Sequence, residues 1–160
     1  MSSEREHPDL LLSNQLCFRL YTASRLIVKS YIPLLTKLGL TYPQYLVMMV
    51  LWEEDGLPVG SIARRLMLGT NTVTPLLKRM EALGLIARRR GGDDMRTTIV
   101  GLTERGREME RTASQIPSTQ VARLICNGAA DELIPGINLR LDSLIVVLRH
   151  LTEEEGAGGE

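Results

Sequence analysis

The chain has 160 residues, of which 44% are hydrophobic and 24% are charged, a size and composition that suit one globular domain. This composition excludes an intrinsically disordered chain, and no apolar run approaches the ~20 residues that a membrane-spanning helix needs. The net charge is zero, but residues 61–100 carry eight Lys or Arg against three Asp or Glu, a local net charge of +5. Such a basic segment favours a phosphate-bearing partner. The first residues lack the pattern of a secretory signal, so we expect a cytoplasmic protein with no membrane partner.

Helical periodicity accounts for the first third of the chain. Apolar residues recur at helical spacing through residues 9–38, with Pro33 bending or ending the run. Thr41 and Gln44 have the spacing of a capping box and start a second helix over residues 42–54. Because this second helix is apolar on all sides, we expect it at the centre of the core.

Two short helices with a tight junction are predicted next, at residues 59–68 and 71–83. Gly69 and Thr70 form the junction, and Gly84 ends the second helix. Such a pair is typical of a helix-turn-helix, whose second helix enters the major groove of DNA.

A basic β-hairpin follows over residues 85–104. Residues 88–90 are three arginines that lead into a turn at residues 91–94, and the β-branched residues 97–100 form the return strand. Thr103 then caps the next helix. A helix pair followed by an arginine-bearing hairpin is the layout of a winged helix-turn-helix, so we predict binding to double-stranded DNA.

The C-terminal part is predicted to hold two helices, at residues 104–116 and 137–151, the first of them ended by Pro117. The helices at both ends of the chain are apolar on more than one face, which predicts packing against a second copy in a homodimer. The predicted fold is therefore one mainly α domain over residues 1–160 with a small β-wing. It comprises a winged helix-turn-helix lobe at about 42–102, dimerisation helices at about 9–38 and 104–151, and a frayed tail at 152–160.

The DNA contacts are predicted on the second short helix and on the wing. Polar side chains near the start of that helix would meet base edges, and basic side chains further along would meet phosphate. On the wing, Asp94 lies two residues before Arg96, on the same strand face, where it would orient the guanidinium toward a narrow minor groove. A solvated helix face and a simple hairpin ion pair are the alternatives. The predicted set is Asn71, Thr72, Thr74, Lys78, Arg79, Arg88, Arg90, Asp94 and Arg96.

The two cysteines, Cys17 and Cys126, lie far apart in the sequence and outside any CxxC motif, and the two histidines have no ligand spacing. We therefore expect no zinc site and no other cofactor. Composition alone leaves open whether the cysteines are small buried side chains or reactive thiols.

Several motifs carry a resemblance to a known family. They are NQLCFRLY (14–21), LTYPQYLV (40–47), LWEEDG (51–56), LLKRME (76–81), DMR (94–96) and LTERG (102–106). Together with the order of elements, they resemble the MarR family of dimeric bacterial transcription regulators, and in particular its organic-hydroperoxide-sensing branch, usually called OhrR. The resemblance is strong over residues 12–106 and diffuse beyond residue 111. It implies a DNA-binding repressor whose signal is an organic hydroperoxide.

The resemblance also implies roles for particular side chains. Cys17 would be the peroxide-reactive thiol, and Cys126 of the partner subunit would resolve its sulfenic acid as a disulfide. By their positions in the motifs, Tyr31 and Tyr42 would donate hydrogen bonds to the thiolate. Tyr21, one helical turn after Cys17 on the same face, is a further candidate donor.

Helix geometry constrains this site. On a continuous helix, Tyr31 lies about 21 Å along the axis from Cys17, which a tyrosine side chain cannot cover. If the two touch, Tyr31 must come from the other subunit, with the first helices antiparallel. One departure from the branch is Gly69, where an Asp is frequent; Thr70 is the alternative capping or phosphate-orienting group.

Two other functions compete with the redox-switched repressor. A MarR-type regulator could instead release DNA on binding a small phenolic or lipophilic ligand, with both cysteines incidental. A thiol peroxidase would also use Cys17, but no arginine lies one turn away to polarise the peroxide, so we do not expect an enzyme.

Overall fold

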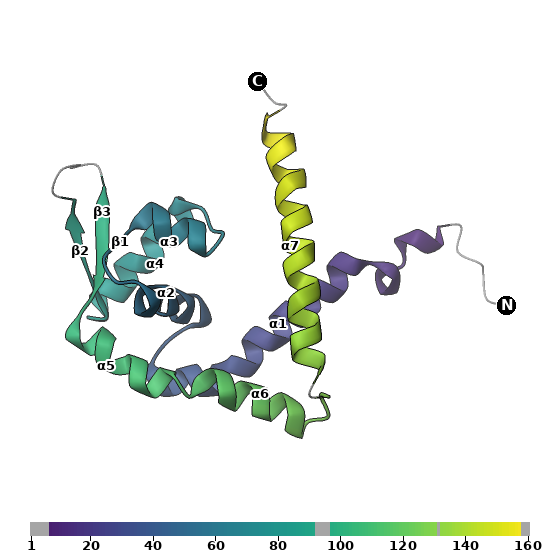
Figure 1. Cartoon of the computed structure of the whole chain (residues 1–160), viewed down its shortest axis with the longest axis horizontal. Helices are drawn as coiled ribbons and strands as arrows, with labels where there is room; N and C mark the ends of the chain where they lie inside the picture. The colour runs from purple at the N-terminus through teal and green to yellow at the C-terminus, as the bar shows by residue number, and fades with distance from the viewer. Residues whose placement is uncertain (1–6, 92–96, 131, 158–160) are drawn as a thin grey trace. The chain divides into compact units, whose positions relative to one another are not determined.

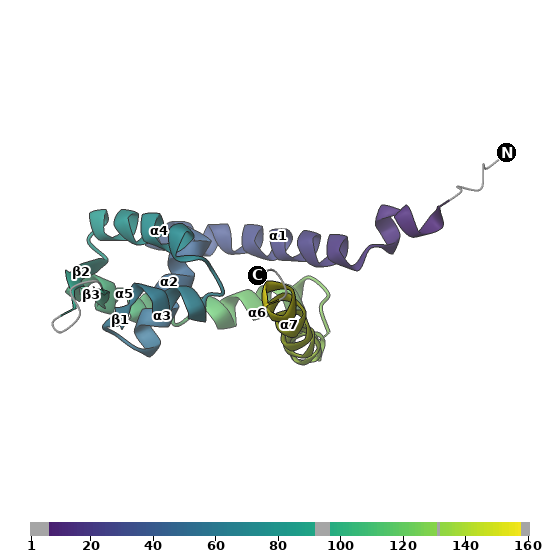
Figure 2. The same cartoon turned by 90° about the horizontal axis from the view of Figure 1, so that it is seen from above.

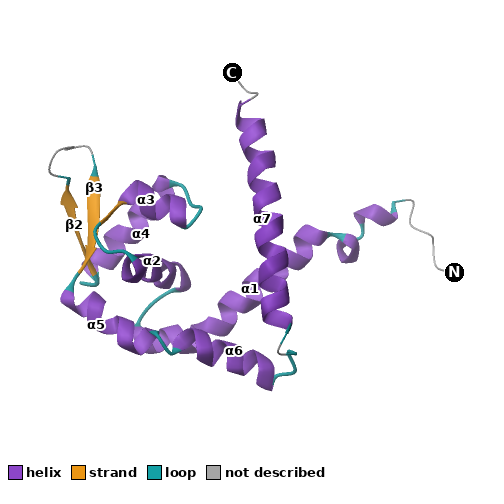
Figure 3. Cartoon of the chain, viewed as in Figure 1, coloured by secondary structure: helices purple, strands orange, loops and turns teal. Residues whose placement is uncertain are grey.

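The computed structural model describes residues 7–91, 97–130 and 132–157, which form a mainly helical chain with one small sheet (Figures 1 and 3). The helices are α1 (Leu16–Leu35), α2 (Tyr42–Glu53), α3 (Val59–Arg65), α4 (Thr70–Ala82), α5 (Glu104–Ala113), α6 (Ile116–Cys126) and α7 (Leu133–Ala157). The strands are β1 (Leu57–Pro58), β2 (Ile86–Arg90) and β3 (Thr98–Leu102), and 3₁₀ turns cover Pro8–Leu10, Leu12–Asn14 and Thr36–Leu38. The chain divides between Ile116 and Pro117 into two compact units.

The first long helix begins later than the sequence predicted. Apolar periodicity placed its start near residue 9, but Leu11 and Gln15 are extended, with ψ angles of 129° and 117°, and α1 starts only at Leu16. Ser13 and Asn14 fall in this break, and short polar side chains of this kind favour turns over helix interiors. From Leu16 the helix is continuous and passes through Pro33 (Figure 2).

The core is built around α2, as its all-round apolar sequence predicted. The backbone N–H of Thr41 donates to Oε1 of Gln44 at 2.8 Å, which confirms the capping box at the start of this helix. Val47 and Met48 are completely buried, and they join core residues from α3, α4 and the sheet. A rigid core of this kind holds the two short helices and the wing in fixed positions.

The helix-turn-helix consists of α3 and α4. Ile62 of α3 and Val73 and Leu77 of α4 are completely buried, which leaves the opposite side of α4 exposed. The chain leaves α3 through Met67, whose φ of 55° is left-handed, and α4 then starts after Gly69. The left-handed residue explains why α3 ends before the predicted residue 68.

The wing is confirmed, with one strand that the sequence did not reveal. β3 is the central strand of a three-stranded antiparallel sheet in the order β1-β3-β2. Arg90 pairs with Thr98 at one end of the hairpin, and Leu57 of β1 pairs with Val100. β1 has only two residues, which is too short to show a strand's alternation in the sequence.

The junction between the wing and α5 relies on a glycine. Thr103 caps α5, because its Oγ1 accepts from the N–H of Gly106 at 3.1 Å and donates to the carbonyl of Gly84 at 2.7 Å. A Cβ on Gly106 would lie 2.2 Å from the carbonyl oxygen of Leu85. The indole of Trp52 donates to the carbonyl of Gly106 at 2.9 Å, so α2 and α5 meet at the same residue.

The C-terminal unit differs from the prediction in two ways. Pro117 does not end a helix; it stands in the first turn of α6, a helix that the sequence analysis missed. Proline suits this position, because first-turn N–H groups have no partner within the helix. α7 runs from Leu133 to Ala157 and so includes most of the tail that was predicted to be frayed.

Among the described residues, no single helix is long and apolar enough to cross a membrane. The segments Leu16–Leu38 and Tyr42–Glu53 meet that criterion of length and composition only as a pair, bent by 70°.

Candidate nucleic-acid interface and cysteine sites

The outer side of α4 carries the predicted base-contacting residues. Asn71 and Thr72 are exposed in its first turn, and Oδ1 of Asn71 accepts from the backbone N–H of Thr72 at 3.0 Å. Thr74 is half-buried, and its hydroxyl donates to the carbonyl of Thr70 at 2.7 Å. Asn71 therefore keeps its amide N–H groups for a partner outside the helix.

Lys78 and Arg79 are both exposed further along α4, as a phosphate-contacting role requires. On the wing, Arg90 is exposed at the last position of β2, at the end of the strand that leads into the connection to β3. The predicted contacts at Asp94 and Arg96 lie outside the described residues.

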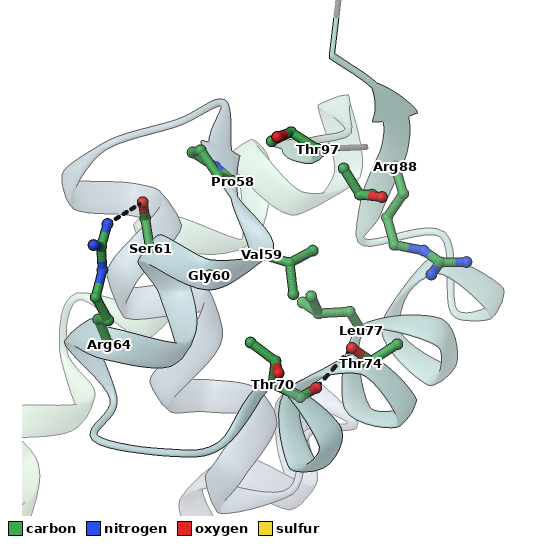
Figure 4. Close-up of a pocket in the computed structure, with 11 residues that line it drawn as sticks. Pro58, Val59, Gly60, Ser61, Arg64, Thr70, Thr74, Leu77, Arg88 and Thr97 are labelled. Atoms are coloured by element: carbon green, nitrogen blue, oxygen red, sulfur yellow. Dashed lines mark hydrogen bonds between the residues drawn. The ribbon is translucent and has the colours of Figure 1, made fainter. Parts of the chain in front are cut away.

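A concavity of about 690 Å³ lies between α3, α4 and the wing (Figure 4). Hydroxyl groups and arginines from all three elements line it, among them Ser61, Arg64, Thr70, Thr74, Arg88 and Thr97. Nη2 of Arg64 donates to Oγ of Ser61 at 3.1 Å. Hydroxyls and guanidinium groups are common phosphate ligands, so this surface is suited to a nucleic-acid backbone. Sequence reasoning missed Ser61 and Arg64, because only the fold brings them beside α4.

Arg88 is held by Glu81. Its backbone N–H donates to Oε1 of Glu81 at 2.9 Å, and its Nε and Nη2 donate to Oε2 at 2.9 and 2.6 Å. The hydrogen bonds from the Arg88 side chain and backbone lower the pKa of Glu81 below its ordinary value. One carboxylate thus ties strand β2 to helix α4.

Asp55 anchors the other end of the wing. Its Oδ1 accepts from the N–H of Leu102 at 2.7 Å and of Gly56 at 2.8 Å, and its Oδ2 accepts from Arg107 at 2.7 Å. Partial burial raises the pKa of Asp55, but these hydrogen bonds outweigh it and hold the pKa below the ordinary value. Asp55 therefore joins the end of α2 to β3 and α5 as an ionised group.

Cys17 lies in the first turn of α1, and its thiol is exposed and free. Gln15 is the N-cap residue of α1, and its side chain makes no capping hydrogen bond to the helix. Helix N-termini carry partial positive charge and unpaired N–H groups. The sequence did not predict a helix N-terminus at Cys17, because its apolar periodicity predicts a helix start at residue 9. Cys126 is the last residue of α6 and is also exposed and free.

Tyr21 is exposed one turn after Cys17, beside an arginine that the sequence analysis did not consider. Nη1 of Arg25 donates to the Tyr21 hydroxyl at 3.2 Å, and the guanidinium lies 5.5 Å from the ring centroid. Cys17, Tyr21 and Arg25 follow one another at four-residue spacing, so they share one face of α1.

Tyr31 and Tyr42 are brought together, as the second half of α1 meets the start of α2. Tyr45, which the sequence analysis did not single out, completes a cluster with centroids 6.3 and 6.5 Å from the other two rings. Burial raises the pKa of each of the three phenols, and the neighbouring hydroxyls raise the pKa of Tyr31 and Tyr45 further. They therefore remain protonated hydrogen-bond donors. Cys17 and Tyr31 lie on one continuous helix, fourteen residues apart, so they do not meet within a subunit.

The helix pair, the polar outer side of α4 and the three-stranded wing define a winged helix-turn-helix DNA-binding protein. Residues 29–112 match the family model for the transcriptional regulator SarA/Rot. The chain is 47% identical over 116 residues to the organic hydroperoxide resistance transcriptional regulator of Bacillus subtilis, covering 72% of this chain and 79% of that relative. It is 38% identical over 105 residues to SarZ of Staphylococcus epidermidis, covering 66% and 71%. The chain therefore belongs to the MarR/SarA family of transcriptional regulators, which is not a family of enzymes.

Solved structures of relatives show the same fold. Reduced AbfR bound to DNA matches with a TM-score of 0.74 and 36% identity, covering 88% of this chain and 94% of that one. The disulfide-formed AbfR matches with a lower TM-score of 0.60 at the same identity, covering 89% and 92%. The repressor CouR bound to a 23-mer DNA duplex matches with a TM-score of 0.68 and 25% identity, covering 94% and 99%. The fold described here is thus one that binds DNA in relatives.

Proposed function

We propose that this protein is a redox-sensing repressor, which binds operator DNA as a homodimer and releases it when an organic hydroperoxide oxidises Cys17. The observation that carries the proposal is the position of Cys17, an exposed thiol in the uncapped first turn of α1. The relative from Bacillus subtilis, named for organic hydroperoxide resistance, supports the nature of the signal.

The chemistry proceeds in two steps. The Cys17 thiolate attacks one peroxide oxygen of ROOH; an S–O bond forms as the O–O bond breaks, and the alkoxide leaves as ROH after taking a proton. The sulfur is oxidised to a sulfenic acid. The thiolate of Cys126 of the partner subunit then attacks that sulfur, and a disulfide forms as hydroxide leaves and is protonated to water.

The thiolate needs stabilisation that its own subunit supplies only in part. The N-terminus of α1 provides unpaired N–H groups beside Cys17. Because Tyr31 lies about 21 Å further along the same helix, the Tyr31 and Tyr42 hydroxyls reach Cys17 only from the partner subunit. The sensor site is therefore shared between two subunits whose first helices are antiparallel.

Exposed apolar side chains support the dimer. Most of the large apolar side chains that are exposed in the described residues lie on α1 and α7. On α1 they are Leu16, Phe18, Leu26, Ile27 and Ile32; on α7 they include Leu139, Val146, Val147 and Leu151. Contiguous exposed apolar faces mark interaction sites, and a second copy also supplies the two recognition helices that operator half-sites require.

Release of DNA follows from the geometry of the disulfide. A disulfide requires Cα atoms within about 7 Å of each other, so closing it across the dimer moves the helices that carry the two cysteines. Such movement shifts the two recognition helices away from one-turn spacing.

Non-reducing gel electrophoresis tests the disulfide directly. Wild-type protein, Cys17→Ser and Cys126→Ser would each be treated with one equivalent of cumene hydroperoxide. We expect wild type to form a covalent dimer of two 17.8 kDa chains and both variants to remain monomeric on the gel. A covalent dimer in Cys126→Ser would rule out Cys126 as the resolving thiol.

A ligand-released regulator is the alternative. One observation favours it: a shallow concavity of about 720 Å³ on α1, lined in part by Phe18, Leu26 and Ile32. Such a regulator would respond to an apolar ligand whether or not Cys17 is present. Release of DNA by a ligand from both wild type and Cys17→Ser would support this alternative.

A further inference from the structure

The carboxylate of Glu81 and the guanidinium of Arg88 link α4, the predicted recognition helix, to the wing. Glu81 lies in the last turn of α4 and Arg88 in the middle of β2. Three donors of Arg88, its backbone N–H and two side-chain nitrogens, meet the two carboxylate oxygens at 2.6 to 2.9 Å. Both side chains are mostly sheltered, with 23% of Arg88 and 36% of Glu81 exposed.

We propose that Arg88 is a positioning residue, which fixes the wing at its working distance from the recognition helix and does not bind phosphate. This inference replaces the direct DNA contact that the sequence predicted for Arg88. It rests on DNA binding alone and is independent of the redox response.

The geometry of the pair favours positioning over phosphate binding. Arg88 lines the concavity, but in Figure 4 its guanidinium points away from Thr70 and Thr97, toward the C-terminal half of α4. Nε and Nη2 of Arg88 already donate to Glu81, and the paired carboxylate offsets the charge that would attract a phosphate to the remaining N–H groups. Repulsion between that carboxylate and the negatively charged DNA further opposes a phosphate contact at Arg88. Arg90, two residues along the same strand face and exposed, is better placed as a backbone contact.

Substitutions at Glu81 and Arg88 distinguish positioning of the wing from simple charge repulsion, because the two roles change the DNA affinity in opposite directions. Removing Glu81 takes a negative charge away from the DNA-binding side. If Glu81 only repelled DNA, Glu81→Ala would therefore bind more tightly; if it positions the wing through Arg88, the same variant binds more weakly. Arg88→Lys keeps the charge but loses the paired hydrogen bonds of a guanidinium.

The experiment measures DNA affinity of the reduced protein by fluorescence anisotropy over a range of salt concentrations. The probe is a labelled duplex recovered from a random-sequence library by selection with the wild-type protein. The variants are Glu81→Ala, Arg88→Ala, Arg88→Lys and the double variant with Ala at both positions, each checked for folding by circular dichroism. Arg90→Ala is the reference for the loss of a cation that contacts phosphate.

The proposal predicts a loss of affinity of about tenfold in Glu81→Ala, Arg88→Ala and Arg88→Lys alike, with little further loss in the double variant. The slope of log affinity against log salt should stay unchanged in these variants, whereas a lost phosphate contact lowers it by about one. Wild-type affinity in Arg88→Lys, or tighter binding in Glu81→Ala together with a reduced slope in Arg88→Ala, would overturn the proposal.

Discussion

The ring of Tyr31 meets the ring of Tyr42 edge to face, with the centroids 5.2 Å apart and the planes at 64°. This contact joins the second half of α1 to the first turn of α2, so it couples the predicted dimerisation helix to the core of the DNA-binding lobe. Under the proposed function, a movement of α1 would reach the DNA-binding lobe through this contact.

The first prediction concerns the hydroxyls of this pair. Tyr31→Phe and Tyr42→Phe keep the ring contact but remove the hydroxyl that we propose donates to the Cys17 thiolate. We expect each to slow oxidation of Cys17 by cumene hydroperoxide about tenfold, the effect of losing one hydrogen bond to a charged group. The rate is followed by mass spectrometry of the thiol.

Tyr45→Phe is the matched control for this experiment. Tyr45 belongs to the same cluster but is buried, with 3% of its surface exposed, so its hydroxyl is not available to a partner subunit. We expect it to oxidise at the wild-type rate. If Cys17 were oxidised at the same rate in Tyr31→Phe and Tyr42→Phe as in Tyr45→Phe, the Tyr31 and Tyr42 hydroxyls would not belong to the sensor site.

The second prediction concerns the packing of α5 against the wing. Gly106→Ala places a methyl group 2.2 Å from the backbone carbonyl of Leu85, which cannot move without disturbing the sheet. We expect the free energy of unfolding in urea to fall by about 1–3 kcal/mol.

Gly60→Ala controls for the loss of glycine itself. Gly60 is a helical glycine in α3, and a Cβ there would meet nothing within 4 Å. This substitution should leave stability unchanged or raise it by about 0.5–1 kcal/mol. If the two variants were equally stable, close packing at Gly106 would not explain the glycine.

The third prediction concerns acid stability. The pKa of Asp55 lies below its ordinary value of 3.8, because the hydrogen bonds from Leu102, Arg107 and Gly56 outweigh the effect of burial. The folded state therefore binds this proton less readily than the unfolded state. Its stabilising contribution is complete above pH 3.8 and is lost as the pH falls through the lower, folded-state pKa.

Urea unfolding at a series of pH values tests this linkage. We expect Asp55→Asn to be less stable than wild type at pH 7 and to lose less stability in acid, so that the two curves converge. Parallel curves would show that Asp55 has the same pKa in the folded and unfolded states.

The fourth prediction separates the two kinds of DNA contact on α4. Asn71→Ala removes amide donors from the exposed first turn, so we expect it to relax discrimination at one base pair by about 1–3 kcal/mol. Lys78→Ala should instead weaken binding to all sequences and lower the salt slope by about one. Competition binding with single-base operator variants distinguishes the two, and uniform weakening by Asn71→Ala would contradict a base contact.

Local signals in the sequence were sufficient for much of the fold. The capping residues Thr41 and Thr103 marked helix starts correctly, because capping depends on residues within one turn. The core face of α4 and the hairpin of the wing followed from apolar spacing and β-branched residues. These elements are short, regular and bounded by their own end signals.

Other features depend on contacts that no local pattern encodes. The start of α1 is set by a backbone break at Gln15, within a segment whose apolar spacing remains helical. The local sequence is equally consistent with Pro117 at the start or at the end of a helix, and in the structure Pro117 lies in the first turn of α6. The ion pair between Glu81 and Arg88 joins α4 to β2 through two residues seven positions apart. The sequence did not predict this pair, because a basic residue in a wing ordinarily indicates DNA contact.

The most direct test of the central claim is fluorescence anisotropy of the DNA complex before and after one equivalent of cumene hydroperoxide, at fixed salt. Wild type and Cys17→Ser would be compared on the same selected duplex. The account predicts that wild type is released, that Cys17→Ser stays bound, and that a dithiol reductant restores the wild-type complex. Continued binding of oxidised wild type, or equal release of Cys17→Ser, would contradict a peroxide switch at Cys17.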